Sequence, residues 1–214
     1  MTGSARIHGF VLLAALVLIS GCAPLLGGGK PDNLYRFGVP VQPESPVEAA
    51  LPAPRPAVLA RVRFAPEIEG DRILTARGQA VLYIKDARWA APAPDLFSQA
   101  VIGQFDRRAP GIRLVPSGER VGSAHAFLRL SIDRFEARYT PGEREDAPPR
   151  IIVAGSASLA DPDSSRPIIE QRFWIEEPAS ANSQSAIAAA FDQAVSRYTT
   201  QLADWCVRAM APAQ

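Results

Sequence analysis

Histidine and cysteine are scarce in this chain, with two of each among 214 residues. His8 lies near the N-terminus and His125 stands alone, so the sequence offers no nucleophile with a positioned histidine base. A catalytic zinc needs three protein ligands, and no His, Cys or spaced carboxylate motif lies near His125. We therefore predict a protein that is not an enzyme and that binds no metal or cofactor.

A strong charge of one sign and a membrane-spanning apolar run are also missing. The formal net charge is +1, whereas a nucleic-acid binder carries a concentrated basic face, so we predict no nucleic-acid partner. Phe10–Ile19 is apolar and uncharged, but a helix needs about 20 such residues to cross a bilayer. An apolar run of this length that follows weakly basic residues, here Arg6 and His8, is typical of a signal peptide.

The residues that follow this run indicate the type of signal. Ile19-Ser20-Gly21-Cys22 resembles a bacterial lipobox rather than an A-x-A-like cleavage site. The resemblance implies that residues 1–21 are a lipoprotein signal peptide and that Cys22 carries lipid, including palmitate-type acyl chains. Two or more chains anchor a protein stably, because each buried CH₂ contributes about 0.8 kcal/mol. No Asp follows Cys22 directly, which by the enteric sorting rule predicts the outer membrane, facing the periplasm.

The other cysteine and the segment after Cys22 have simpler interpretations. With Cys22 lipidated, Cys206 has no disulfide partner, and its helical context predicts a packing role. Residues 22–57 are rich in proline and glycine and poor in large apolar residues, so we predict a disordered tether. Asn33–Gly38, "NLYRFG", is the exception and could dock on the domain as an edge strand. Residues 58–210 are predicted to form one domain.

Hydrophobic periodicity within residues 58–210 predicts the fold class. Two-residue alternation predicts strands, and a phase slip near Asp133-Arg134 predicts a bulge in the longest of them. Apolar steps of three and four predict two helices, the first capped by Asp95. The predicted strands are 58–64, two strands within 72–84, 125–139, 151–161 and 167–177; the predicted helices are 94–108 and 183–210. This order predicts an α+β fold, a mainly antiparallel sheet with both helices packed on one face.

The stretch Val62–Pro92 carries a series of short motifs in a fixed order. They are Pro66, Ile73-Leu74-Thr75-Ala76-Arg77, Leu82-Tyr83-Ile84 and Arg88-Trp89-Ala90-Ala91-Pro92, preceded by Tyr35-Arg36-Phe37. The series resembles the ABC-type transport auxiliary lipoprotein family, which includes the lipoprotein of the paraquat-inducible operon. The second motif is one residue longer than in the family, and Tyr35-Arg36-Phe37 replaces its Y-x-L element.

This resemblance implies a non-catalytic partner of a transport machine. In the family, an inner-membrane permease and ATPase work with a periplasmic MCE-domain protein that carries phospholipid-like molecules. The lipoprotein would dock that MCE component at the outer membrane, and a homo-oligomer is one form that it could take. Two alternatives stay open. One is a lipid-binding carrier with an apolar cavity between helices and sheet, and the other is an envelope-assembly accessory lipoprotein.

Three residues near the end of the resembling stretch are candidates for the partner interface. Trp89 beside Arg88 has the composition of a binding hot spot, although a tryptophan just before a helix also often packs in the core. Tyr83 is the third candidate, and packing is the stronger interpretation for it. The loop Thr140–Arg150 and the tether are further candidate contact surfaces.

Overall fold

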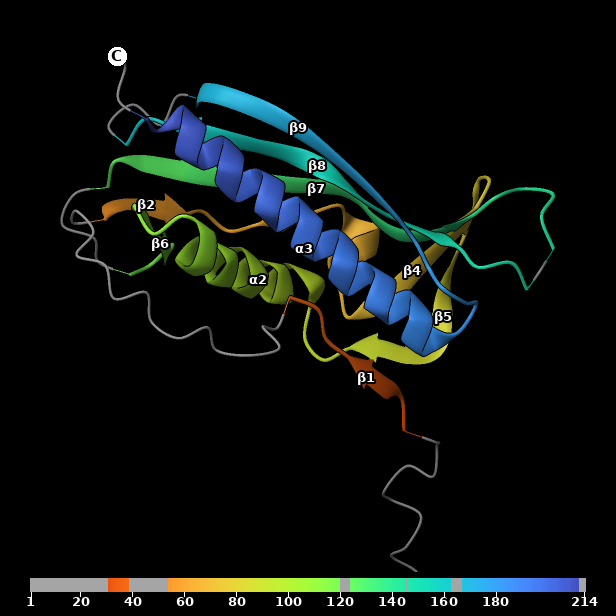
Figure 1. The fold of residues 1–214 in the computed structure, drawn as a ribbon. Helices are drawn as coiled ribbons and strands as arrows, with labels where there is room; N and C mark the ends of the chain where they lie inside the picture. Colours follow the sequence, from red (N-terminus) through yellow and green to blue (C-terminus); the bar gives the residue numbers. More distant parts are fainter. Residues whose placement is uncertain (1–30, 39–53, 120–123, 145, 163–166, 212–214) are drawn as a thin grey trace, which may run out of the picture. The chain divides into compact units, whose positions relative to one another are not determined.

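Two helices lie on one face of a nine-stranded sheet in a computed structural model of the chain (Figure 1). The structure describes residues 31–38, 54–119, 124–144, 146–162 and 167–211, and Asp32–Gln214 forms one compact unit. The predicted signal peptide, Cys22 and most of the predicted tether lie outside the described residues. Among the helices that are described, none is long and apolar enough to cross a membrane.

The antiparallel part of the sheet is built on one long strand. This central strand, β7 (Ala126–Tyr139), pairs with β8 (Arg150–Ala160), and β8 pairs with β9 (Pro167–Pro178). The register of β7 against β8 shifts between Ile132 and Arg134, so the predicted bulge is confirmed. In the described part of the sheet β9 pairs with β8 alone, which makes it an edge strand.

On its other edge, β7 pairs with parallel strands. Three short strands follow one another along it, all parallel to β7: β2 (Arg55–Leu59), β3 (Arg63–Phe64) and β4 (Arg72–Arg77). Beyond them lie β6 (Ile112–Pro116), parallel to β2, β5 (Ala80–Trp89), antiparallel to β4, and β1 (Asn33–Tyr35), parallel to β5. A short 3₁₀ helix, η2 (Pro66–Ile68), lies between β3 and β4.

The sheet is therefore mixed, and the prediction of a mainly antiparallel sheet was wrong. Strands joined by a turn or hairpin loop are antiparallel, as in β4–β5 with Gly78 at φ 62° in the turn. Strands that meet after a longer crossover can run parallel. Alternation along a strand reports which residues are buried and carries no information on direction. The predicted strand 58–64 is also interrupted, forming β2 and β3.

Both helices place apolar side chains on the same face of the sheet. The first, α2 (Ala93–Arg108), begins after Pro92, so Asp95 lies in its first turn rather than at the cap. The second, α3 (Gln184–Ala209), is capped by Ser183, whose hydroxyl accepts the Ala186 N–H. The predicted stripe of α3 is buried along its whole length: Ile187, Phe191, Val195, Tyr198, Leu202 and Trp205.

An aromatic cluster fills the space between helices and sheet. Phe135 of β7 lies at its centre, 6.4 Å from Phe97 of α2 and 4.8 Å from Phe191 of α3 between ring centroids. Contacts from both helices to one β7 side chain confirm that they cover one face. Cys206 lies at the end of this core, 1% exposed, and burial raises the pKa of its thiol to about 12. A thiol of this kind packs as a small apolar group.

Candidate functional site

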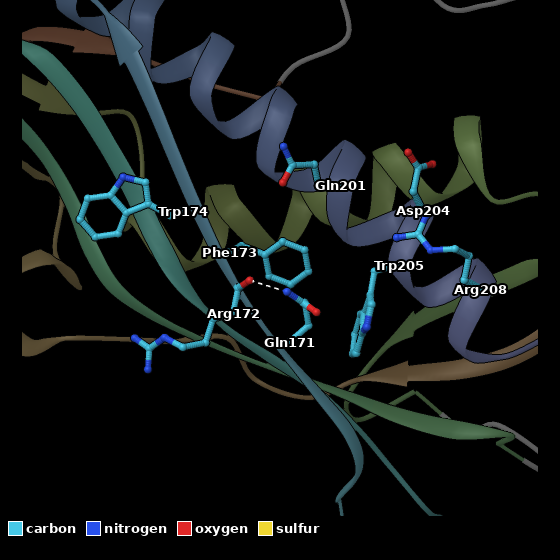
Figure 2. A pocket seen from close by; sticks show the side chains of 8 residues that line it. All are labelled: Gln171, Arg172, Phe173, Trp174, Gln201, Asp204, Trp205 and Arg208. Carbon is cyan, nitrogen blue, oxygen red and sulfur yellow. Dashed lines mark hydrogen bonds between the residues drawn. The ribbon is translucent and has the colours of Figure 1, made fainter.

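A cavity of about 460 Å³ lies where the edge strand β9 meets the C-terminal half of α3 (Figure 2). We call it the β9–α3 pocket. Its lining comes from four successive residues of β9 and from one side of two helical turns of α3. These are Gln171, Arg172, Phe173 and Trp174 on β9, and Gln201, Asp204, Trp205 and Arg208 on α3.

The alternation of β9 explains why the pocket has an apolar floor and an aromatic rim. Phe173 points toward α3 and is 8% exposed, with its ring 6.1 Å from that of Trp205 and 5.2 Å from that of Tyr198. Trp174 points the other way and is 56% exposed. Since β9 is the edge of the described sheet, its outer backbone groups run beside this aromatic surface.

The charged groups of the pocket are partly paired. Arg172 reaches Asp133 at 3.1 Å, and Asp204 is held by Arg108 of α2 at 2.8 Å. The hydrogen bond from Arg108 holds the pKa of Asp204 below its usual range, and the charge of Arg208 acts in the same direction. Asp204 is thus bound directly by Arg108 and feels the charge of Arg208 as well. The pocket therefore offers arginine donors and aromatic surface next to the edge of a strand, where the Arg172 carbonyl accepts the Gln171 side chain (Figure 2). This combination suits an extended, partly acidic segment.

The described residues form no metal-ligating cluster. No group of three or more His, Cys, Asp or Glu side chains there is placed to hold a metal ion. His125 is not among the residues that line the pocket, and its backbone N–H binds the Pro56 carbonyl at 2.8 Å.

The structure places the three predicted interface residues together on β5, away from the pocket lining. Trp89 is 2% exposed, with its ring 4.9 Å from Phe37 and 5.1 Å from Phe191. Its burial supports the packing interpretation and leaves no ring surface for a partner in this conformation.

Arg88 and Tyr83 are engaged with groups of the chain itself. Arg88 binds the carboxylates of Asp32 and Asp71, the latter at 3.1 Å, and the Asp32 hydrogen bond is the main reason that its pKa is raised. The Tyr83 hydroxyl donates to the Glu67 carbonyl at 3.0 Å. Arg72 lies over the Tyr83 ring, 3.7 Å from its centroid. An interface role for Arg88 or Tyr83 stays a prediction.

Comparison with known proteins identifies the family. A family model described as the ABC-type transport auxiliary lipoprotein component matches residues 35–203. The chain belongs to this family. Membership makes it an envelope lipoprotein that serves as an auxiliary component of an ABC-type transport system. The resemblance of Tyr35 to Pro92 to this family is thereby confirmed.

Solved structures share the fold of this auxiliary lipoprotein. Protein XCC0632 from Xanthomonas campestris is 24% identical with a TM-score of 0.68, and the match covers 82% of this chain and 95% of that one. An uncharacterized protein is 13% identical with a TM-score of 0.63, over 83% and 99% of the two chains. No curated protein matches the chain.

Sequence reasoning did not single out the pocket of the auxiliary lipoprotein. One signal was present in "RFWIEE" (Arg172–Glu177), where Phe173 and Ile175 define the buried face. Trp174 then falls on the opposite face, beside Arg172 and Glu176, and tryptophan and arginine are enriched among the residues that dominate interfaces. That α3 would stand next to this strand could not be derived from local pattern.

Proposed function

We propose that this auxiliary lipoprotein is the membrane-anchored, non-catalytic docking subunit of an ABC-type lipid transport system. Lipid on Cys22 anchors it in the outer membrane, and the folded body holds the periplasmic MCE-domain component of the transporter. The observation that supports docking is the β9–α3 pocket, where a strand edge without a neighbouring strand runs beside Trp174 and Arg208. Aromatic residues and arginines are the side chains that most often dominate protein interfaces.

The pocket suggests how the MCE component binds. An extended segment of the partner can add to β9 as a further strand, because β9 has no strand partner on its outer side in the described sheet. The Gln171 side chain, which donates to the Arg172 carbonyl at 2.8 Å (Figure 2), would be displaced when the segment binds. Alternate side chains of that segment would meet Trp174 or Phe173, according to the face they occupy. A carboxylate among them would meet the Arg208 guanidinium.

The alternative function, a lipid carrier, has less support. A carrier needs an apolar cavity between helices and sheet, with room for acyl chains. The rings of Phe97, Phe135 and Phe191 occupy this space, with centroid separations of 4.8 to 6.4 Å. Docking accounts for an aromatic surface at the rim, whereas lipid carriage calls for an empty interior.

A crosslinked pull-down from native envelope membranes, read by mass spectrometry, tests the proposal. The wild-type lipoprotein is expected to recover an MCE-domain protein with its permease and ATPase. Trp174→Ala combined with Arg208→Glu is expected to lower this recovery about tenfold or more, the effect of losing interface hot spots. Cys22→Ala is expected to move the protein out of the membrane fraction.

Val207→Ala is the matched control, since Val207 is 45% exposed on α3 and does not line the pocket. It should leave recovery unchanged. Recovery of unrelated envelope proteins alone would favour the assembly-accessory function. Phospholipid that copurifies with the body would favour the carrier.

A further inference from the structure

The short segment Asp32–Gly38, which we call the N-terminal latch, is built into the folded body. Phe37 is its main apolar contact, 2% exposed, with its ring 4.9 Å from Trp89 and 5.2 Å from Phe135. The segment thus contributes a side chain to the centre of the aromatic cluster. Phe37 is far too buried for a residue of a free tether.

Hydrogen bonds and an ion pair hold the latch to β5 and to α3. On the β5 side, β1 pairs in parallel, the Tyr35 carbonyl accepts the Ala90 N–H at 2.8 Å, and Arg88 binds Asp32. On the α3 side, the Asn33 amide donates to Gln184 at 2.8 Å. The Gly38 N–H donates to the Asp192 carboxylate at 2.7 Å.

Gly38 also fits this site in a way that other residues would not. Its φ is 71°, and a Cβ built on it would lie 2.2 Å from the Cβ of Ala100 on α2. Positive φ and a close helix backbone both favour glycine. The latch therefore ends at a residue that has to be glycine, both for its backbone conformation and for the close approach of α2.

The chain is held again at Arg55, after residues 39–53. The Arg55 N–H binds the Gly111 carbonyl at 3.0 Å, its guanidinium binds the Met210 carbonyl at 2.9 Å, and β2 pairs with both β6 and β7. Residues 39–53 thus join two points that are both fixed on the body. They add nothing to the distance between the membrane anchor and that body.

We propose that only the stretch from Cys22 to Asp32, which we call the leash, connects the lipid anchor to the folded body. The contacts of the latch then hold the body to this leash. This inference rests on the lipidation of Cys22 in the proposed function. At about 3.3–3.6 Å per residue, ten residues span at most about 35 Å, whereas a tether running from 22 to 57 would span about 120 Å. The leash ends beside Gln184, and Arg208 of the β9–α3 pocket lies about 35 Å further along α3. The docking pocket is then held within about 70 Å of the lipid surface.

Site-specific proteolysis of the lipidated full chain in phospholipid vesicles that lack the transporter tests the latch. A protease site placed after Glu48 cuts the covalent path between Cys22 and the body. The latch is expected to keep the cut body in the membrane pellet. A second variant, with the site after Gly28, is expected to release the body on cutting, because that cut severs the leash itself.

Gly38→Ala in the Glu48-cut protein weakens the latch without touching the leash. Strain at positive φ and the clash with Ala100 are expected to raise the released fraction roughly tenfold. Gly111→Ala is the matched control, since no atom lies within 4 Å of a Cβ there, and it should leave the body in the pellet. Release of the wild-type body after the Glu48 cut, as complete as after the Gly28 cut, would overturn the proposal. So would retention that is insensitive to Gly38→Ala.

The same cut in a Cys22→Ala chain separates failure of the latch from failure of the anchor. On size-exclusion chromatography the N-terminal fragment that carries Asp32–Gly38 is expected to elute with the body. Separation of the two pieces would refute the latch even if Cys22 is lipidated. Co-elution together with membrane binding that does not depend on Cys22 would instead refute the anchor and, with it, the leash.

Discussion

At the scale of single residues, Gly155 of β8 has the shortest approach to a neighbouring backbone among the described glycines. A Cβ built there would lie 2.1 Å from the Ser131 carbonyl oxygen and 2.9 Å from the Ile132 Cα. Both atoms belong to the β7 backbone just before its bulge. Backbone in the middle of a sheet cannot move aside for one methyl group without breaking the ladder on both of its edges, so glycine is required here for space.

Gly155→Ala is therefore expected to lower the free energy of unfolding by about 2 kcal/mol or more, as overpacking does elsewhere. Urea denaturation of the wild-type and variant bodies measures the difference. Gly111→Ala, where the added methyl meets no neighbour, should change stability by less than about 0.5 kcal/mol. Equal stability of Gly155→Ala and wild type would show that β7 and β8 are further apart at the bulge.

At the scale of elements, the two helices are joined by one well-placed ion pair. Arg108, in the last turn of α2, binds Asp204 of α3 at 2.8 Å. The hydrogen bond from Arg108 lowers the pKa of Asp204 below its unfolded value. A carboxyl group shifted in this direction stabilises the fold at pH values above its unfolded pKa, and this contribution disappears as the pH falls through its folded pKa.

Asp204→Asn is accordingly expected to lower the thermal midpoint at pH 6 and to leave it nearly unchanged at pH 2. The effect is small because both side chains are partly exposed. Thermal unfolding followed by circular dichroism at both pH values tests this, with Asp106→Asn on the exposed side of α2 as the control. A difference that persists at pH 2 would assign the effect to packing rather than charge.

At the scale of the whole molecule, the folded body begins with the latch and not with β2. Phe37 occupies a position between Trp89 and Phe135, and β1 covers the outer edge of β5. Without residues 32–38, that aromatic surface would be exposed to water. The latch is therefore part of the structural core as well as the end of the leash.

A chain that begins at Asp32 is expected to match the stability of one that begins at residue 22. A chain that begins at Pro54 should lose about 3–5 kcal/mol, the usual effect of removing a buried phenylalanine. Differential scanning calorimetry of the three chains in one buffer makes the comparison. Equal midpoints for the chains starting at Asp32 and Pro54 would place the latch outside the cooperative unit.

Local patterns predicted several elements of the fold closely. The stripe of α3, the turn at Gly78 and the bulge after Ile132 follow from residue spacing, because each depends on neighbours within a few positions. The edge-strand interpretation of Asn33–Gly38 is confirmed by the pairing of β1 with β5. The parallel pairing along β7 was not predictable, since it depends on where distant segments return.

The residues of the β9–α3 pocket were not singled out from the sequence. A tryptophan beside an arginine gives the same sequence pattern whether its ring faces a partner or the core. In the structure, Trp89 faces the core. Trp174 also has an arginine close by in the sequence, yet it is exposed and lines the pocket. The difference lies in what covers each ring, α3 and the latch in one case and solvent in the other.

The sequence by itself determined the features that are encoded within short segments of the chain. The lipobox-like Ile19–Cys22, the family motifs from Tyr35 to Pro92 and the periodicity of α3 need no knowledge of distant contacts. Tertiary structure alone decided the mixed sheet, the pocket between β9 and α3, and the capture of Phe37 within the aromatic cluster. Each of these joins segments far apart in the chain, and their meeting depends on the burial of the whole core rather than on local preference.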